Sequence, residues 1–219
     1  MSAQEIGIQE GLKDLKLFRM AEIASDRIVL ASKQKWSPRK LLMDLIEEEA
    51  SFRREKTVRS RIRRASLVES WTLETFPFDL QPGVDQAQIM DLADLADLDF
   101  VRKGINIVFI GKPGVGKTGL ASSLLLKALL DGYLGLTQRM QDLLDDLLRS
   151  IADRTTKNLM NRLSRLDVLL ADERGYLCLN KDQSNLFFKL MDNRFFKLMD
   201  NRYLAKKSTI ITTNLGFDV

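Results

Sequence analysis

One stretch near the middle of the chain has the residue types and the spacing that bind phosphate. Its pattern is G-x-x-x-x-G-K-[ST], and one more glycine follows the pattern. The nine residues are Gly111, Lys112, Pro113, Gly114, Val115, Gly116, Lys117, Thr118 and Gly119. The glycines let successive backbone N–H groups turn toward phosphate oxygens, where a side chain would otherwise intrude. We expect Lys117 to reach the outer phosphates and the Thr118 hydroxyl to hold a magnesium ion that bridges them.

The segments on either side of this loop predict the elements that position it. The apolar run Ile105–Ile110 predicts a β-strand, and Leu120–Leu130 predicts a helix that stops at Asp131-Gly132. A helix that comes directly after the loop directs its N-terminus, with its unpaired N–H groups, at the bound anion.

Two later apolar runs end in polar residues and complete the candidate site. The run Leu166–Glu173 ends in two acids, and the run Ser208–Thr213 is followed by Asn214. In phosphate-loop enzymes an acid at the end of a strand orders magnesium, a role that falls to Asp172 here. Glu173 is then placed to act as general base on the attacking water, and Asn214 to hold that water or the γ-phosphate. The sequence therefore predicts an α/β fold with a mainly parallel sheet.

Other segments of this half predict smaller elements. A weak strand is expected at Leu134–Thr137, with amphipathic helices at Met140–Ile151 and Thr155–Leu163. Between the last two strands, the eight residues Phe187–Arg194 recur without change as Phe195–Arg202. Eight residues add about 12 Å of helix and rotate the downstream residues by ~80°, so we expect the added copy to change the structure if it stays helical.

The first part of the chain predicts helices only. Apolar residues from Met1 to about Leu67 are spaced for helical stripes, and Ser37-Pro38 is a good start for a second long helix. The run Glu47–Glu49 is expected on the outer face of that helix.

That helix then becomes strongly basic. Seven cations against Glu55 give a local charge of +6 (seven minus one): Arg53, Arg54, Lys56, Arg59, Arg61, Arg63 and Arg64. One interpretation is contact with nucleic-acid phosphates; the other is a solvated helix face, or one that pairs with the acidic stretch beyond it. Because no aromatic residue interleaves the cations, any such contact is expected with the backbone of duplex DNA.

The charge changes sign near residue 70, where we expect a domain boundary. Glu74 to Asp99 contains seven acids and no lysine or arginine. The predicted division is a helical DNA-binding region at 1–70, a linker and lead-in helix at 71–104, and a phosphate-loop core at 105–219. Phe76 and Phe78 in the linker could pack on the next domain or on a nucleotide base, and we expect core packing.

Composition excludes several kinds of chemistry. The 219 residues contain no histidine, which excludes Ser-His-Asp and Cys-His catalysis and histidine-ligated zinc. Cys178 is the single cysteine, so an intramolecular disulfide is impossible. With no apolar leader and no apolar run near ~18 residues, we expect a cytoplasmic protein without a membrane partner.

Together these motifs resemble the IstB-like ATP-binding proteins, AAA+ helpers of insertion-sequence transposition that are related to the helicase loader DnaC. Beyond the loop and the strand ends, the resemblance rests on these segments: Leu15–Met20, Thr72–Phe78, Gly132-Tyr133, Gln141–Leu143, Asn161–Leu163, Asp172–Leu177 and Thr209–Leu215. It implies a P-loop NTPase of AAA+ type preceded by a small all-helical domain. It also implies ATP and Mg²⁺ as cofactors, and duplex DNA, a separate transposase and further copies of the chain as partners.

The same resemblance implies roles for individual residues. Lys117 would bind phosphate, Thr118 and Asp172 the metal, Glu173 the attacking water, and Asn214 would sense the γ-phosphate. The basic helix becomes the expected DNA contact. Gly119 stands where the family usually has histidine, and Arg174 where it has an apolar residue.

The family pattern also has one copy of the repeated segment, and it continues beyond the position of Val219 into a segment that supplies an arginine finger. We therefore expect a core that is truncated at its C-terminal end, in which ATP binding is better supported than hydrolysis.

Two other functions remain open from the residues. A helicase loader would use an apolar face of the N-terminal helices to hold a helicase, whereas the arginines favour DNA. A small-molecule kinase would need an arginine-bearing lid, which the sequence does not show, and the pair Asp172-Glu173 suits activation of water.

Overall fold

The computed structural model describes residues 3–69, 71–80, 87, 89, 98–173 and 194–214. The chain divides into two compact units, Met1–Ser60 and Arg61–Val219. This division lies ten residues before the boundary expected from composition (70 minus 60). The reason is that Ala65 is fully buried in the core of the second unit, where its carbonyl accepts a hydrogen bond of 2.7 Å from the Thr137 N–H.

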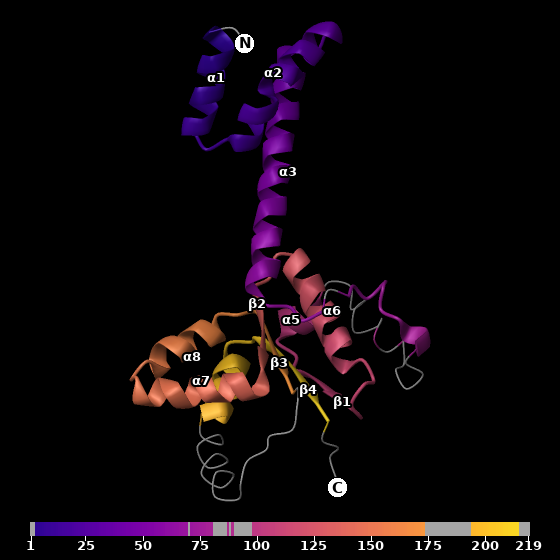
Figure 1. The fold of residues 1–219 in the computed structure, drawn as a ribbon, viewed down its shortest axis with the longest axis vertical. Coiled ribbons are helices and arrows are strands. Elements are labelled where there is room, and N and C mark those ends of the chain that lie inside the picture. Colours follow the sequence, from indigo (N-terminus) through magenta and orange to yellow (C-terminus); the bar gives the residue numbers. More distant parts are fainter. Residues whose placement is uncertain are drawn as a thin grey trace, which may run out of the picture. The chain divides into compact units, whose positions relative to one another are not determined.

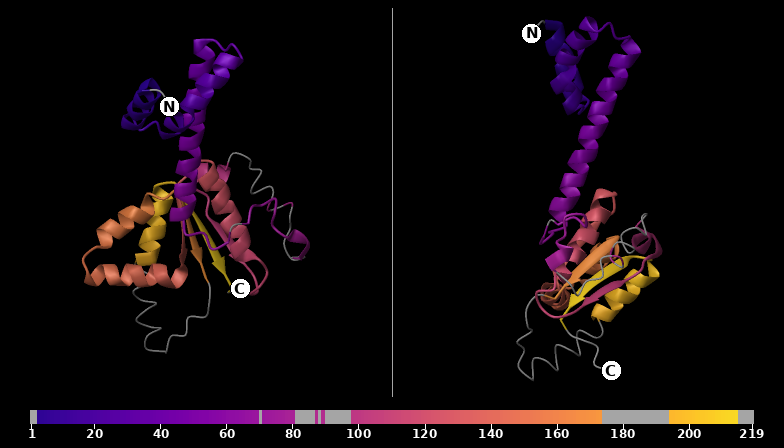
Figure 2. Two further views of the ribbon diagram at one scale, coloured as in Figure 1. Left: turned by 45° about the horizontal axis from the view of Figure 1, so that its top comes forward. Right: turned by 90° about the vertical axis from the view of Figure 1, so that its right-hand side faces the viewer.

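The first unit is made of helices, as predicted. They are α1 (Ala3–Asp14), α2 (Phe18–Lys33) and α3 (Pro38–Arg64), which Figures 1 and 2 show in indigo and purple; the last four residues of α3, 61–64, belong to the second unit. The predicted helix start at Ser37 is confirmed, because its hydroxyl accepts a hydrogen bond of 3.2 Å from the Lys40 N–H.

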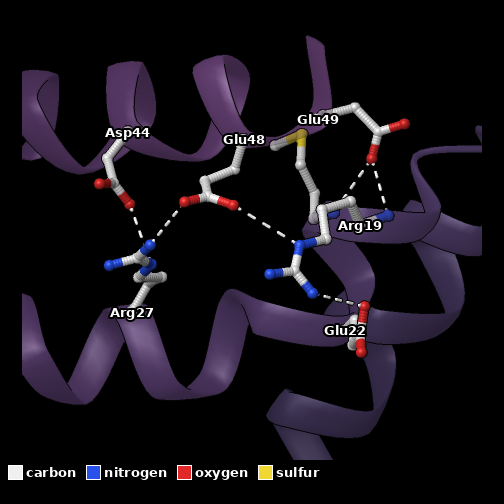
Figure 3. A network of polar contacts seen from close by, with 7 residues as sticks. Arg19, Glu22, Arg27, Asp44, Glu48 and Glu49 are labelled. Atoms are coloured by element: carbon white, nitrogen blue, oxygen red, sulfur yellow. Dashed lines mark hydrogen bonds and ion pairs between the residues drawn. The ribbon is translucent and has the colours of Figure 1, made fainter. Parts of the chain in front are cut away.

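Ion pairs join α2 to α3 in this unit (Figure 3). Arg27 lies between Asp44, at 3.2 Å, and Glu48, at 2.8 Å, while Arg19 contacts Glu48 at 3.5 Å and Glu22 at 2.8 Å. Pairs this exposed contribute at most about 1 kcal/mol each, so they orient the helices more than they stabilise them.

Glu49 has a larger role in the same interface. Leu17, at the N-cap of α2, offers no capping side chain, and Glu49 Oε2 instead accepts hydrogen bonds from the Arg19 N–H at 2.8 Å and the Met20 N–H at 3.0 Å (Figure 3). Its other oxygen accepts one of 2.7 Å from Arg53 Nε. Glu49 is only 4% exposed, so its expected place on the outer face is wrong. The physical reason is that a carboxylate from α3 satisfies the unpaired N–H groups of α2.

Glu49→Gln is expected to weaken the first unit by about 1–2 kcal/mol, since it removes a charge-assisted cap. Burial alone would raise the pKa of Glu49, but the hydrogen bonds from the Met20 N–H and Arg53 outweigh it and the net pKa is lowered. A carboxylate with a lowered pKa stabilises the fold above its ordinary pKa of 4.5, and that stabilisation is lost as the pH falls through the folded pKa.

Amide exchange at Arg19 and Met20 measures this effect in the full chain. At pH 7 the amides of Glu49→Gln should exchange about tenfold faster than those of wild type. The difference should shrink below pH 4.5. Glu47→Gln, which changes an exposed carboxylate on the same helix, should leave the exchange unchanged. If the exchange rates of Glu49→Gln and wild type differ by the same factor at pH 3 and at pH 7, the cap does not depend on a charged carboxylate and the prediction is wrong.

The second unit is built on a parallel four-stranded sheet, which confirms the predicted fold class. Its strands are β1 (Ile107–Ile110), β2 (Gly135–Arg139), β3 (Val168–Asp172) and β4 (Ser208–Thr213), in the order β1-β4-β3-β2. The predicted weak strand before the second helix of this half is therefore real. Parallel neighbours bring the carboxyl ends of β1, β3 and β4 to one edge of the sheet.

Helices cover both faces of this sheet (Figure 1). On β3, Val168 and Leu170 pack with α6 (Lys117–Leu130) in one core, while Leu169 and Ala171 belong to the other. The second core contains side chains of α7 (Met140–Ala152), α8 (Thr156–Ser164) and the helical residues 194–204. All five β3 residues are buried, which explains why that strand reads as a continuous apolar run.

The linker is partly described. Phe76 is buried and meets Phe78 edge to face with ring centroids 4.9 Å apart, so the predicted core role of both rings is confirmed. The short helices η1 (Phe78–Leu80) and α5 (Asp99–Lys103) flank a stretch of which only residues 87 and 89 are described, and the predicted lead-in helix lies largely outside the described residues. Among the described helices, none has both the length and the apolar character needed to cross a membrane.

The second copy of the repeat supplies a buried cation. Arg202 is 1% exposed and donates to the carbonyls of Leu163, Leu166 and Ser208 and to the Thr209 hydroxyl. Burial lowers the pKa of Arg202 to about 10, so the guanidinium stays charged at neutral pH. Of the first copy only Arg194 is described, at the start of the helical residues 194–204.

Candidate functional site

The phosphate loop lies between β1 and α6, where the sequence predicted it. Gly114 has φ +85° and Gly116 has φ +80°, a region of backbone conformation that favours glycine. Gly116 is also the residue directly before α6. The two glycines therefore allow the sharp turn that exposes the first N–H groups of α6, which carry the positive end of the helix dipole.

Lys117 is held at the mouth of this turn by three oxygens. Its Nζ donates to the carbonyls of Gly111, at 2.7 Å, and Lys112, at 2.8 Å, and to Asn214 Oδ1 at 2.9 Å. Burial lowers the pKa of Lys117, while the nearby carboxylates of Glu173 and Asp172 oppose that shift. The lysine is therefore an oriented cation whose partners are weak enough for phosphate oxygens to replace them.

Asp172 ends β3 inside the site. It is 1% exposed, and its Oδ1 accepts a hydrogen bond of 2.8 Å from the Thr118 hydroxyl and a short one from the Thr212 hydroxyl. The register of the sheet explains the second contact, because Asp172 lies opposite Thr212 on β4. Thr118 and Asp172, predicted as metal ligands, are thus brought together at the start of α6.

Glu173 lies one residue further, in contact with the end of β4. Its Oε2 accepts hydrogen bonds from the Thr213 hydroxyl and, at 3.1 Å, from the Asn214 N–H. Asn214 therefore touches both Glu173, through its backbone, and Lys117, through its side chain. The two residues predicted to act on the attacking water converge with the loop lysine.

Lys117, Glu173 and Asn214 line a pocket of about 410 Å³, and Asp172 lies behind its lining, bound to Thr118 and Thr212. Its lining consists of Glu69, Pro113, Gly114, Gly116, Lys117, Thr118, Gly119, Glu173, Thr212 and Asn214. Of the predicted binding residues, Gly111 and Lys112 contribute carbonyls to Lys117, and Val115 does not line the pocket. Thr212 and Glu69 were not predicted. The polar end of the β4 run signalled Thr212, whereas no pattern marked Glu69.

The basic segment of α3 is used in two ways. Arg53 is engaged within the first unit, where it binds Glu49 and donates to the Lys16 carbonyl at 2.7 Å. Lys56 lies over the Phe18 ring at 5.9 Å, and Arg61 is half-buried. The remaining four are exposed: Arg54, Arg59, Arg63 and Arg64.

The phosphate loop, the acidic end of β3 and the parallel sheet together define the P-loop NTPase fold. Residues 10–219 match the family described as IstB-like ATP binding protein. The chain belongs to this family, which confirms the resemblance found in the sequence.

Curated relatives agree with this assignment. The chain is 32% identical over 206 residues to a protein of Pseudomonas aeruginosa named for ATP binding in insertion sequence IS21; the match spans 94% of this chain and 73% of that protein. It is 30% identical over 206 residues to the corresponding IS232 protein of Bacillus thuringiensis subsp. berliner, spanning 94% and 78%.

Among solved structures, the AMPPCP-bound DnaA from Aquifex aeolicus is similar, with a TM-score of 0.52 and 21% identity. The match covers 68% of this chain and 43% of that one. Identity this low shows a shared fold and no more.

Proposed function

We propose that this protein binds ATP with Mg²⁺ and acts as an ATP-dependent helper of DNA transposition. In this role it assembles on duplex DNA through the basic end of α3 and recruits a separate transposase. The observation that carries the proposal is the convergence of Lys117, Glu173 and Asn214 on one pocket beside a phosphate loop, with Asp172 bound to Thr118 of the same lining. The insertion-sequence relatives support the biological setting.

The donor set of the pocket fits a magnesium nucleotide. The Thr118 hydroxyl and Asp172 carboxylate are oxygen ligands 2.8 Å apart, and Mg²⁺ in such sites takes one or two protein ligands together with substrate phosphates. When bound, the metal would neutralise charge on the phosphate oxygens. Lys117 would exchange its carbonyl partners for the outer phosphates.

Glu173 and Asn214 supply the chemistry of hydrolysis in this proposal. Glu173 would take a proton from the attacking water, for which its carboxylate must give up the hydrogen bonds from Thr213 and Asn214. Asn214 would then turn its side chain from Lys117 toward the γ-phosphate. Before nucleotide binds, these hydrogen bonds occupy the Glu173 carboxylate and the Lys117 ammonium group, and the nucleotide would replace them.

Duplex DNA would lie against the exposed cations of α3. Each arginine that neutralises a phosphate releases counterions, which makes the affinity fall steeply with salt. Charge reversal of Arg54, Arg59, Arg63 and Arg64 to glutamate is expected to weaken duplex binding about 100-fold or more, and to reduce the salt slope by about 3 to 4. Fluorescence anisotropy with labelled duplex, in the presence of ATP over a salt series, measures both quantities.

A matched variant separates local contact from net charge. Lys33, Lys35, Arg39 and Lys40 are four exposed cations of the first unit, and their reversal changes the net charge equally. That variant should keep most of the wild-type salt slope. Equal losses in the two variants would mean that α3 makes no specific contact with DNA, and the DNA part of the proposal would fail.

A second candidate function, the loading of a helicase, has one observation in its favour. Leu42, Met43 and Ile46 lie in α3 and are each more than half exposed, which is a surface suited to a protein partner. The charge-reversal experiment separates the two functions. If the protein is a loader that holds a helicase through these apolar residues, reversal of the four arginines should leave its affinity for duplex DNA unchanged.

A further inference from the structure

An acidic side chain lies where a phosphate pocket would not be expected to have one. Glu69 lines the pocket together with Gly114, Gly116 and Thr118 of the phosphate loop. It is half-buried, and within the described part of the chain its carboxylate makes no hydrogen bond or ion pair. The carboxylate is therefore available to accept hydrogen bonds from a ligand that enters the pocket.

Gly119 makes room for this carboxylate. A Cβ built on Gly119 would come within 2.8 Å of Glu69 Oε2 and 3.0 Å of a carbon of the Phe76 ring. Any side chain at this position would therefore displace Glu69 from the first turn of α6. Since Phe76 is buried in the core, the carboxylate is the group that would move.

The position of Glu69 decides which part of a nucleotide it could meet. The outer phosphates belong to Lys117, which lies with Asn214 and Glu173 at the carboxyl ends of β3 and β4. Glu69 lies instead beside Gly119, the residue after Thr118, where the loop reaches the α-phosphate. A carboxylate repels phosphate and accepts hydrogen bonds from hydroxyls, and the ribose hydroxyls come directly after the α-phosphate.

We propose that Glu69 accepts hydrogen bonds from the 2′- and 3′-hydroxyls of the bound nucleotide and so determines its preference for ribonucleotides. Gly119 acts with it by leaving the space that the carboxylate occupies. This inference rests on the proposed ATP binding and names the part of the pocket that recognises the sugar. One hydrogen bond to a charged acceptor contributes about 1.5–3 kcal/mol, so even one of the two corresponds to a preference of about 10- to 100-fold.

The test compares equilibrium binding of ATP and of 2′,3′-dideoxyATP, each with Mg²⁺, to the full chain. Wild type should bind ATP about 10- to 100-fold more tightly than dideoxyATP. Glu69→Ala should reduce this ratio to about one by weakening ATP alone, and Glu69→Gln should give an intermediate ratio because the amide keeps a neutral acceptor. Gly119→Ala should also reduce the ratio, since its Cβ displaces the carboxylate.

Glu74→Ala is the matched control, because Glu74 is an exposed carboxylate five residues further along the chain that does not line the pocket. Its ratio should equal that of wild type. If wild type binds ATP in a manner that depends on Lys117 but Glu69→Ala keeps the wild-type ratio, this inference is overturned while the proposed function stands. If wild type shows no ATP binding that depends on Lys117, the proposed function fails first.

Discussion

Lys117→Ala is expected to lower ATP affinity about 100-fold or more. The lysine is the cation held at the mouth of the loop, and a charge-assisted hydrogen bond to phosphate contributes about 1.5–3 kcal/mol, with further loss where the site excludes water. The variant also releases Asn214 Oδ1 and two loop carbonyls, which water can reach because Lys112 is exposed. The fold should therefore survive. Isothermal titration with ATP and Mg²⁺ measures the change.

Glu173→Gln separates binding from chemistry in the same pocket. Glutamine keeps an oxygen that can accept from Thr213 and Asn214, so ATP affinity should be retained while turnover falls by about 10²- to 10⁴-fold. Lys103→Ala, which removes an exposed lysine paired with Asp99, should change neither quantity. If Lys117→Ala keeps the full ATP affinity of wild type, the loop does not bind the phosphates of ATP as proposed, whatever the result for Glu173→Gln.

Arg202→Met is expected to destabilise the second unit by about 3–5 kcal/mol. The change leaves the carbonyls of Leu163, Leu166 and Ser208 without their donor in a buried setting, and each such acceptor costs about 1–3 kcal/mol. The loss of the unfavourable buried charge offsets part of this cost. Amide exchange along β3, which is buried throughout, measures the change in the full chain.

The chain contains its own control for this prediction. Arg194 occupies the same place in the other copy of the eight-residue repeat, with identical neighbours before it, but it is only half-buried. Arg194→Met should cost less than about 0.5 kcal/mol. A larger effect of Arg194→Met than of Arg202→Met would mean that Arg194 of the first copy is the arginine that binds these carbonyls. Equal effects would mean that the two copies alternate in that position.

The sequence predicted the parts of this molecule that depend on periodicity and on strand ends. The apolar run of β3 and the acids after it indicated a buried parallel strand with Asp172 at the sheet edge, and both features are present. The convergence of Glu173, Asn214 and Lys117 was predictable because parallel strands bring their carboxyl ends together. These inferences need only local pattern and one rule of topology.

The residues that the sequence misplaced or missed depend on contacts between distant segments. Glu49 sits in a run of three acids that resembles a solvated face, yet its partners are backbone N–H groups thirty residues earlier. Arg202 looks like any surface arginine until the carbonyls of three separate segments surround it. Glu69 reaches the pocket because the chain just before the linker lies against Gly119 of α6. Every residue has backbone donors or acceptors, so the sequence does not indicate which side chains will bind them.

The strand order has a consequence for how the protein reaches its folded state. Ile107 of β1 pairs with Ile210 of β4, residues that are 103 positions apart in the chain (210 minus 107). During synthesis β1 and the phosphate loop leave the ribosome well before β4, so β1 has no strand to pair with until β4 has also left it. Such long-range pairing slows folding and exposes apolar strand edges in the meantime. The helices of the first unit have local contacts and can form before then, so the part proposed to contact DNA is made first and the nucleotide pocket last.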